Sequence, residues 1–285
     1  MSVLSVKKSV YTSRSEYFTL HPLSKDSIPV KIHYLTIDVE ASSRPLVVFF
    51  TGFGEQNEKA LYSASRPFVE KGFSTIAVAL PFHKMSPELA TWLINNGLRD
   101  FLKHIAPAKT FVLAGTSRGA AIAACATKLT SNCEGLAMIL PFGLSKITAR
   151  AYVRRAFWDY LVGLSFLDKA ARRTSRAVIH EAWHHMKNPG GLTGAFRLAM
   201  AQTENVTNSL KIFDVATKKL AVFVGKKDRV FTLQECSISL KQLLGEKGEQ
   251  AIIPLNGGHS TVGSKLGQSQ LRHVAQWLAT EYPGR

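Results

Sequence analysis

The chain is predicted to adopt an α/β fold, in which a mostly parallel sheet carries helices on both faces. Two observations predict this fold class. Short runs that are apolar on both faces alternate with segments of helical periodicity, and Gly or Pro ends several of the runs. Parallel neighbours in a sheet need a crossover between them, so this alternation is typical of strands joined by helices. With 285 residues, 46% of them hydrophobic, the chain is long enough for one large core.

The first half of the chain contains an edge followed by buried strands. Alternating runs over about residues 15–38 predict half-buried antiparallel strands at a sheet edge. The apolar runs at residues 45–50 and 75–80 predict strands covered on both faces, with a helix over residues 57–71 between them. The same alternation continues with a helix over residues 87–105, a strand at 110–114, a helix directly after Ser117 and a strand at 136–140.

The second half departs from the sheet and then returns to it. Residues 144–217 are helical, aromatic and basic in pattern, and no strand-like run interrupts them. Strands are expected at residues 219–225 and 250–255, and a final helix over residues 268–282. We therefore expect a core made of residues 1–143 and 218–285, with residues 144–217 inserted after the sixth strand as a helical, basic unit.

A candidate nucleophile lies between a predicted strand and a predicted helix. The run at residues 110–114 ends in Gly115-Thr116-Ser117-Arg118-Gly119, which matches G-x-S-x-G. Glycine flanks allow the backbone to close tightly at a sharp strand-to-helix turn, and such a turn lifts the serine hydroxyl clear of the sheet. The motif is short enough to arise by chance, so the residues at the ends of the other predicted strands must show whether Ser117 is a nucleophile.

An acid and a base follow the last two predicted strands. Asp228 lies in the loop after residues 219–225, and His259 follows the strand at 250–255 in Gly257-Gly258-His259. Open α/β sheets place their sites at the carboxyl ends of strands, so both side chains are expected at the same edge as Ser117. A serine nucleophile needs a base for its proton and a group that orients the base. Asp214, before the same strand as Asp228, is the alternative acid, although it lies at the other end of that strand.

With these motifs the chain resembles the α/β-hydrolase superfamily over about residues 30–277. The resemblance rests on residues 50–54 (Phe-Thr-Gly-Phe-Gly), the Ser117 turn, residues 225–230 and residues 257–259, all at ends of predicted strands, and on the order Ser, Asp, His. It implies an oxyanion hole made by the backbone N–H groups of Phe53 and Arg118, and a cap over the site formed by residues 144–217. Thr51 departs from the family, whose members often carry histidine there.

A rival motif lies in the predicted insertion. His180-Glu181-Ala182-Trp183-His184 spells H-E-x-x-H, in which two histidines one helical turn apart can bind zinc and the glutamate can activate water. Glu204 is a conceivable third ligand. A zinc peptidase would leave the Ser, Asp and His order at the strand ends without an explanation, so we expect no metal site here.

The charge and the targeting signals limit which partners and which cellular location can be expected. The net charge is +16, and eleven Lys and Arg stand against four Asp and Glu between residues 146 and 211. This excess favours an anionic partner or an acidic carrier protein, while no nucleic-acid motif accompanies it. The sequence contains no apolar stretch of signal-peptide or membrane-span type, and three cysteines are too few for a disulfide framework. We expect a cytoplasmic protein.

These observations predict a serine hydrolase that cleaves an ester, thioester or amide of a small acyl substrate through an acyl-enzyme. Ser117 is the expected nucleophile, His259 the base and Asp228 the orienting acid, with no metal or organic cofactor. The alternative is a binding or scaffold protein on a hydrolase fold, with the basic insertion as its working surface.

Overall fold

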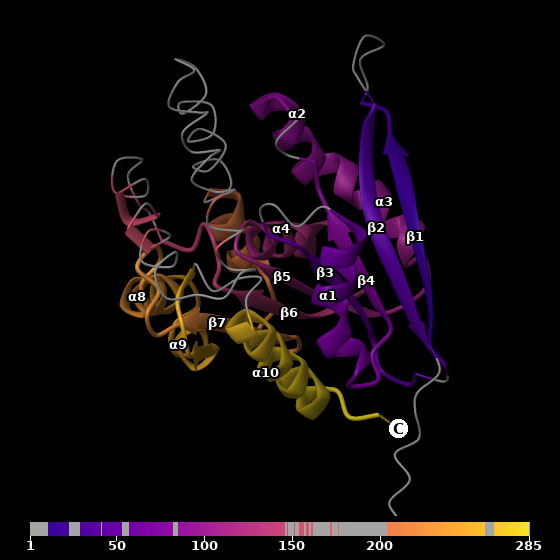
Figure 1. Cartoon of the computed structure of the whole chain (residues 1–285). Helices are drawn as coiled ribbons and strands as arrows, with labels where there is room; N and C mark the ends of the chain where they lie inside the picture. The colour runs from indigo at the N-terminus through magenta and orange to yellow at the C-terminus, as the bar shows by residue number, and fades with distance from the viewer. Residues whose placement is uncertain are drawn as a thin grey trace, which may run out of the picture.

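The computed structural model describes residues 11–22, 29–40, 42–52, 57–81, 85–145, 204–259 and 265–284, with positions 147, 151, 154–156, 158, 159, 161, 172 and 176. An eight-stranded sheet with the order β1-β2-β4-β3-β5-β6-β7-β8 runs through this part (Figure 1). β1 pairs antiparallel with β2, and β2 pairs antiparallel with β4. Every other neighbouring pair is parallel, which confirms the predicted mostly parallel sheet.

The strands fall close to the predicted runs. Their bounds are β1 Tyr11–Leu20, β2 Val30–Val39, β3 Leu46–Phe50, β4 Thr75–Ala79, β5 Phe111–Thr116, β6 Cys133–Ile139, β7 Lys219–Gly225 and β8 Ile252–Leu255. β3, β4 and β5 are buried along their whole length, as expected of strands covered on both faces. The carboxyl ends of β3, β5, β6, β7 and β8 therefore meet at one edge of the sheet.

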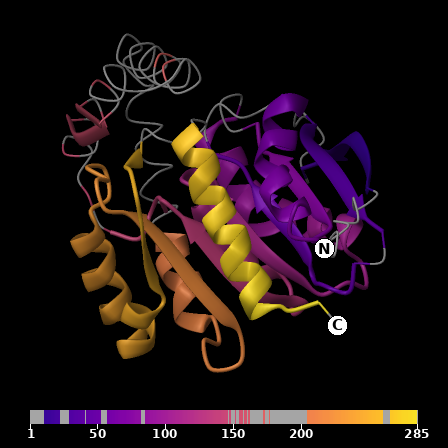
Figure 2. The ribbon, with the colours of Figure 1, turned by 60° about the horizontal axis from the view of Figure 1, so that its bottom comes forward.

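Helices cover both faces of the sheet. The helices are α1 Glu58–Val69, α2 Pro87–Trp92, α3 Leu98–Ile105, α4 Arg118–Ala126, α8 Leu233–Leu244, α9 Glu246–Gln250 and α10 Lys265–Glu281. Apolar side chains of α1 and α10 pack on one face, and those of α3, α4 and α8 pack on the other. Figure 2 shows α10 lying across its face of the sheet. None of the helices in the described ranges is long and apolar enough to cross a membrane.

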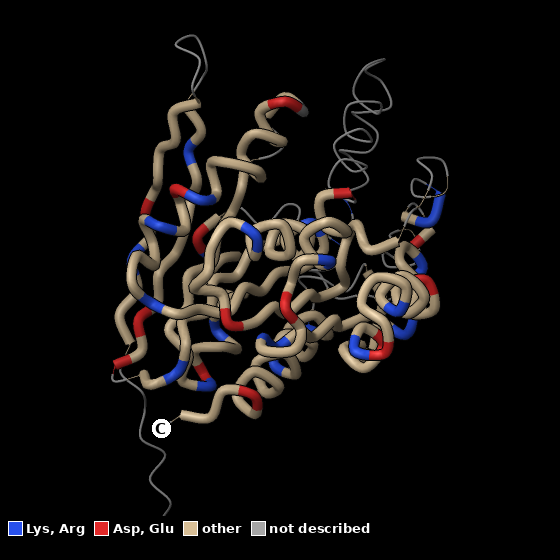
Figure 3. The backbone as a smooth tube through the Cα atoms, turned by 180° about the vertical axis from the view of Figure 1, so that it is seen from behind, with Lys and Arg blue, Asp and Glu red and all other residues tan. Residues whose placement is uncertain are grey.

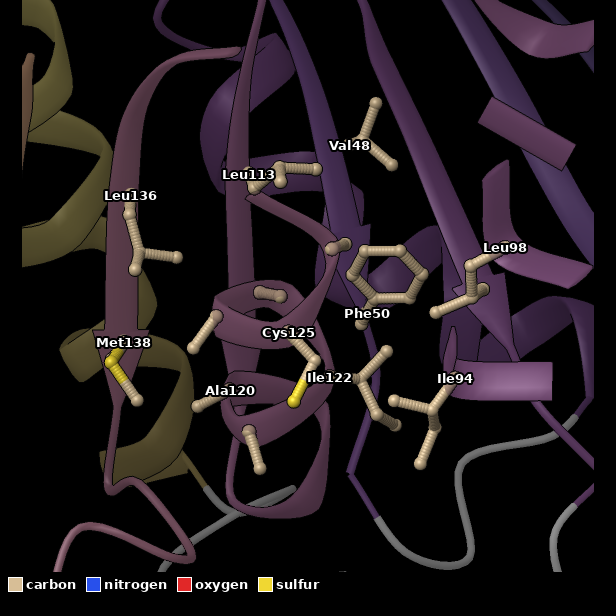
Figure 4. Packing of buried hydrophobic residues seen from close by; sticks show 14 of the residues in the cluster. Val48, Phe50, Ile94, Leu98, Leu113, Ala120, Ile122, Cys125, Leu136 and Met138 are labelled. Carbon is tan, nitrogen blue, oxygen red and sulfur yellow. The ribbon is translucent and has the colours of Figure 1, made fainter. Parts of the chain in front are cut away.

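The core consists of two layers on opposite sides of the sheet. Along β3, Val47 and Phe49 enter one layer, and Val48 and Phe50 enter the other. This alternation follows from the two-residue side-chain period of a strand. Figure 4 shows Val48, Phe50 and Leu113 among the side chains of the layer that also holds Ile122 of α4. The packing fixes α4 against β3 and β5, and so fixes the turn that joins β5 to α4.

The structure differs from the sequence prediction in three places. β1 was expected to be half-buried, but its first seven residues are exposed and Tyr17 is 68% accessible, because β1 lies at the edge and pairs only with β2. α8 and α9 had no predicted counterpart. The helix expected over residues 87–105 is divided by a π-helical turn at Leu93–Gly97.

Between β6 and β7 the chain leaves the sheet, in the region predicted as an insertion. The described residues there are helical at positions 151, 154–156, 158, 159, 161, 172 and 176 and over 204–212. Five of its eleven basic residues fall within the described part (Arg154, Arg155, Arg172, Arg176 and Lys211). Figure 3 shows Lys and Arg interspersed with Asp and Glu over the described chain as a whole. The boundaries of the insertion and its role as a cap stay predictions.

Candidate active site

Ser117 occupies a strained turn between β5 and α4. Its backbone has φ 52° and ψ −118°, in a region that residues with a Cβ rarely adopt. Gly115 and Gly119 make the turn sterically feasible, because a Cβ on Gly115 would overlap the backbone of Gly119, and a Cβ on Gly119 would overlap the carbonyl oxygen of Phe50. The turn is held by hydrogen bonds from the Ser117 N–H to the Ile139 carbonyl (2.8 Å) and from the Phe142 N–H to the Ser117 carbonyl (3.1 Å).

The Ser117 hydroxyl lies next to the imidazole of His259. The distance from Ser117 Oγ to His259 Nε2 is 2.8 Å, although 142 positions separate the two residues in sequence. On the other side of the ring, His259 Nδ1 lies 3.0 Å from Asp228 Oδ2. A carboxylate only accepts hydrogen bonds, so Nδ1 carries the proton and Nε2 is left to accept from the serine hydroxyl. The structure therefore brings Ser117, His259 and Asp228 into one hydrogen-bonded series.

Asp228 is held in place from both of its oxygens. While Oδ2 faces His259, Oδ1 accepts the backbone N–H groups of Val230 (2.8 Å) and Phe231 (3.0 Å). The side chain of Asp228 is fully buried, and that of His259 is 6% exposed. A buried carboxylate with three hydrogen-bond donors has one orientation available, which fixes the ring of His259 in turn.

The environment of His259 favours its protonated form. Burial is the largest influence and acts to lower the pKa of His259. The negative charge of Asp228 and its hydrogen bond, together with the charge of Asp159, outweigh burial and leave the pKa of His259 above its ordinary value of 6.5. The imidazole is thus arranged to accept a proton and to be stabilised once it is charged.

The loop after β3 lies beside Ser117. A Cβ on Gly52 would be 3.6 Å from the Cβ of Ser117. Arg118 is the first residue of α4, and the backbone N–H groups of a first helical turn carry partial positive charge toward the helix N-terminus. Phe53, the other expected oxyanion donor, lies outside the described residues. Two aromatic rings flank the site: Phe231 is 5.8 Å from His259 and 5.3 Å from Phe142, centroid to centroid.

The alternative candidates lie elsewhere or outside the described part. Asp214 lies in the exposed turn that precedes β7, where its carboxylate accepts from the Thr217 hydroxyl and the Ala216 N–H rather than from a histidine. His180, Glu181 and His184 of the H-E-x-x-H motif lie outside the described residues. Within the described ranges, no group of three or more His, Cys, Asp and Glu side chains is placed to hold a metal ion.

Sequence reasoning missed a second layer of charged residues around the triad. Arg155, from the helical segment after β6, forms an ion pair with Glu235 of α8 at 2.8 Å. Asp159, one helical turn further on, is buried and acts electrostatically on His259. The Thr232-x-x-Glu235 capping box was a readable signal for α8, whereas nothing local to residue 159 indicates its contact with a loop about one hundred residues away.

Comparison with known proteins supports the fold. Neither a protein-family model nor a curated protein sequence matches the chain. Among solved structures, it is similar to the esterase domain of a Rhodothermus marinus protein (TM-score 0.55, 14% identity, 95% of this chain and 99% of that chain). A Pyrobaculum calidifontis esterase (0.55, 16%, 94% and 85%) and a thioesterase domain from the curacin biosynthetic pathway (0.52, 13%, 94% and 99%) are also similar.

These likenesses extend over nearly the whole chain, and they define the class of fold. The chain has the α/β-hydrolase fold. Identities of 13–16% carry the architecture alone, so the activity has to be argued from the site.

Proposed function

We propose that the chain is a serine hydrolase that cleaves an ester, thioester or amide bond through an acyl-enzyme intermediate. One observation carries the proposal. Ser117 Oγ lies 2.8 Å from His259 Nε2, and His259 Nδ1 lies 3.0 Å from a buried Asp228 whose other oxygen is occupied by two backbone N–H groups. Nucleophile, base and orienting acid thus stand in the geometry that general-base activation of a hydroxyl requires.

In the acylation half of the reaction, Ser117 Oγ attacks the carbonyl carbon of the substrate. The proton of the hydroxyl passes to His259 Nε2, and the imidazolium that forms is stabilised by the Asp228 carboxylate. The carbonyl oxygen gains negative charge as the tetrahedral species forms. We assign its stabilisation to the backbone N–H of Arg118, at the start of α4, and to that of Phe53 in the loop that begins beside Ser117.

His259 then returns the proton to the leaving group as the tetrahedral species collapses, which completes acylation and leaves an acyl ester on Ser117 Oγ. In the second half, His259 accepts a proton from a water molecule that attacks this ester. It gives that proton back to Ser117 Oγ as the acid product departs, which regenerates the free hydroxyl. The three side chains and the backbone donors complete each proton and charge transfer, so the scheme needs no metal or organic cofactor.

The structural neighbours support an oxygen or sulfur leaving group. Those described above are named as esterases and a thioesterase. At their low identity to this chain they share its architecture, so their names indicate which leaving groups to test first and say nothing of the acyl group. We therefore rank esters and thioesters before amides as substrates.

The segment between β6 and β7 is proposed as a cap over this site. Arg155 in its first helical part contacts the loop that carries Asp228, and Asp159 lies beside the loop that carries His259. A segment anchored on both loops is positioned to line a substrate pocket. The predicted affinity of its basic residues for an anionic partner or an acidic carrier protein, and the predicted cytoplasmic location, stay as expectations.

The experiment is a hydrolysis screen run beside a nucleophile variant. Purified wild type and Ser117→Ala are assayed against p-nitrophenyl esters, acyl thioesters and aminoacyl amides of graded chain length. The proposal expects turnover of at least one ester or thioester by the wild type and a loss of roughly 10⁶-fold in kcat for Ser117→Ala. Turnover that survives in Ser117→Ala contradicts the assignment of the nucleophile. No turnover of any substrate would favour the binding-protein alternative.

A further inference from the structure

One helical segment after β6 rests on the loop that carries the triad acid. Arg155 Nη1 donates to Glu235 Oε2 at 2.8 Å and to the carbonyl oxygen of Val230 at 3.5 Å. The same Glu235 oxygen accepts from the N–H and the hydroxyl of Thr232, which begins α8. Val230 in turn donates its N–H to Asp228. Arg155 therefore anchors the helical segment directly to the acid loop.

The same segment places a carboxylate against the loop that carries the triad base. Asp159 lies four residues after Arg155, so the two side chains are on one face of a helix. Asp159 is 5% exposed, whereas the neighbouring Trp158 is 54% exposed. A Cβ on Gly258 would lie 3.4 Å from Asp159 Oδ1, so this carboxylate packs on the backbone of the residue that precedes His259. The glycine itself is required by the carbonyl oxygen of Lys227, which would lie 2.7 Å from a Cβ at position 258.

Two carboxylates thus act on one imidazole. Burial acts to lower the pKa of His259, and the charges of Asp228 and Asp159 act to raise it, with Asp228 also bonded to Nδ1. Among the described residues, these two are the charged groups that act on the ring. Within the described part of the chain, the Ser117 hydroxyl at Nε2 and the ring of Phe231 also contact the imidazole. Asp159 therefore complements Asp228 from a different part of the chain.

We propose that Asp159 is a positioning residue for His259: anchored through Arg155, it holds the His259 loop and stabilises the imidazolium that forms when Ser117 is acylated. This inference rests on the proposed function. Its consequence is that the helical segment after β6 is part of the triad's support as well as a candidate cover for the substrate. Loosening the segment should change the chemistry at His259, even where no residue that touches substrate is altered.

The direct test is the titration of His259 in Asp159→Asn. The substitution keeps the size of the side chain and removes its charge. Protein labelled with ¹³C at histidine Cε1 is titrated by NMR, and His259→Gln identifies the signal among the nine histidines. We expect the midpoint of the His259 titration to move to lower pH in Asp159→Asn, because one of the two charges that stabilise the imidazolium is gone. Asp100→Asn, which removes an exposed carboxylate on α3, should leave the midpoint unchanged.

The kinetic counterpart is the pH dependence of kcat/KM for an activated ester. We expect the acid limb of Asp159→Asn to move to lower pH together with the NMR midpoint. On the plateau kcat should fall by less than about a hundredfold, far below the ~10⁴-fold loss expected when the orienting acid itself is replaced. Asp159→Glu, which keeps the charge, should restore most of the acid limb. If Asp159 had a packing role alone, its replacement would lower activity or stability without moving the acid limb of the pH profile.

The outcomes separate this inference from the proposed function. If the wild type hydrolyses esters but the His259 midpoint and the acid limb are the same in Asp159→Asn, Asp159 has no such role, and the triad assignment stands. If the wild type lacks activity, the proposed function fails, and the NMR titration still measures the effect of Asp159 on the imidazole. Should Asp159→Asn not fold, Arg155→Gln takes its place. Loss of that anchor should shift the midpoint in the same direction, and an unchanged midpoint would overturn the inference.

Discussion

Replacing Asp228 by asparagine should disable the proposed triad while leaving the fold almost intact. Asp228 Oδ1 accepts two backbone N–H groups, from Val230 and Phe231. The amide oxygen of asparagine would take over that position, because the amide nitrogen cannot accept. The NH₂ group would then face His259 Nδ1, 3.0 Å away in the native arrangement, and would require Nδ1 to be the acceptor. The imidazole would be held in the tautomer that carries its proton on Nε2, where it cannot take a proton from Ser117.

The size of the effect follows from this change of tautomer. A wrongly protonated histidine in such a triad costs about 10⁴-fold in kcat, or about 5 kcal/mol of transition-state stabilisation. The fold keeps both backbone hydrogen bonds and weakens only the contact to the ring, so the free energy of unfolding should drop by about 1 kcal/mol. For a domain of this size, that corresponds to a decrease in Tm of about 3 °C.

The assay is ester hydrolysis by Asp228→Asn and by Asp214→Asn, with thermal unfolding of both. Asp214 bonds to Thr217 and to the Ala216 N–H at the other end of β7, so its variant should keep wild-type activity within about threefold. Activity of Asp228→Asn within tenfold of the wild type would refute the reasoning about the tautomer. A large loss in Asp214→Asn would move the acid to that position.

Three further predictions follow from the geometry. The pKa of His259 lies above 6.5, so the acid limb of the pH profile of kcat/KM should have its midpoint above pH 6.5. The same raised pKa affects the free energy of unfolding. Relative to His259→Gln, the imidazolium should stabilise the wild type below pH 6.5, and this contribution should disappear as pH rises through the folded-state pKa. The three cysteines are buried, and burial raises their thiol pKa values to about 11 or 12, so a thiol reagent should label none in the native protein and all three after unfolding; labelling of the native protein would contradict their burial. Gly119→Ala should cost more than about 3 kcal/mol in chemical denaturation because its Cβ would overlap the Phe50 carbonyl, whereas Gly245→Ala, with open space around it, should cost about 1–2 kcal/mol for its positive φ alone.

The parts of the fold that were predictable are those in which local pattern and burial agree. β3 and β4 are apolar at every position because both faces of the sheet are covered, and their sequences show this directly. The turn at Ser117 was predictable for a related reason. Gly115 and Gly119 lie where any Cβ would overlap backbone atoms. This steric requirement is visible in the sequence, because it leaves two glycines at a fixed spacing around Ser117.

Of the features that the sequence reasoning missed, one was readable and the others depend on tertiary contacts. α8 was readable, because Leu233, Cys236, Leu240 and Leu243 recur at helical spacing directly after the capping box. The exposure of β1 depends on its place at the edge of the sheet, which no single strand reveals. Asp159 contacts the loop of His259 from a helical segment whose Arg155 docks on the acid loop, an arrangement that exists only once the chain has folded.

The central claim is that the Ser117 oxygen is the atom that becomes acylated. Treatment of the native protein with a fluorophosphonate, followed by proteolysis and tandem mass spectrometry, tests it most directly. One adduct on Ser117 is predicted, absent from Ser117→Ala and formed far more slowly in His259→Gln. A native protein that stays unmodified, or an adduct on any other residue, would contradict the account.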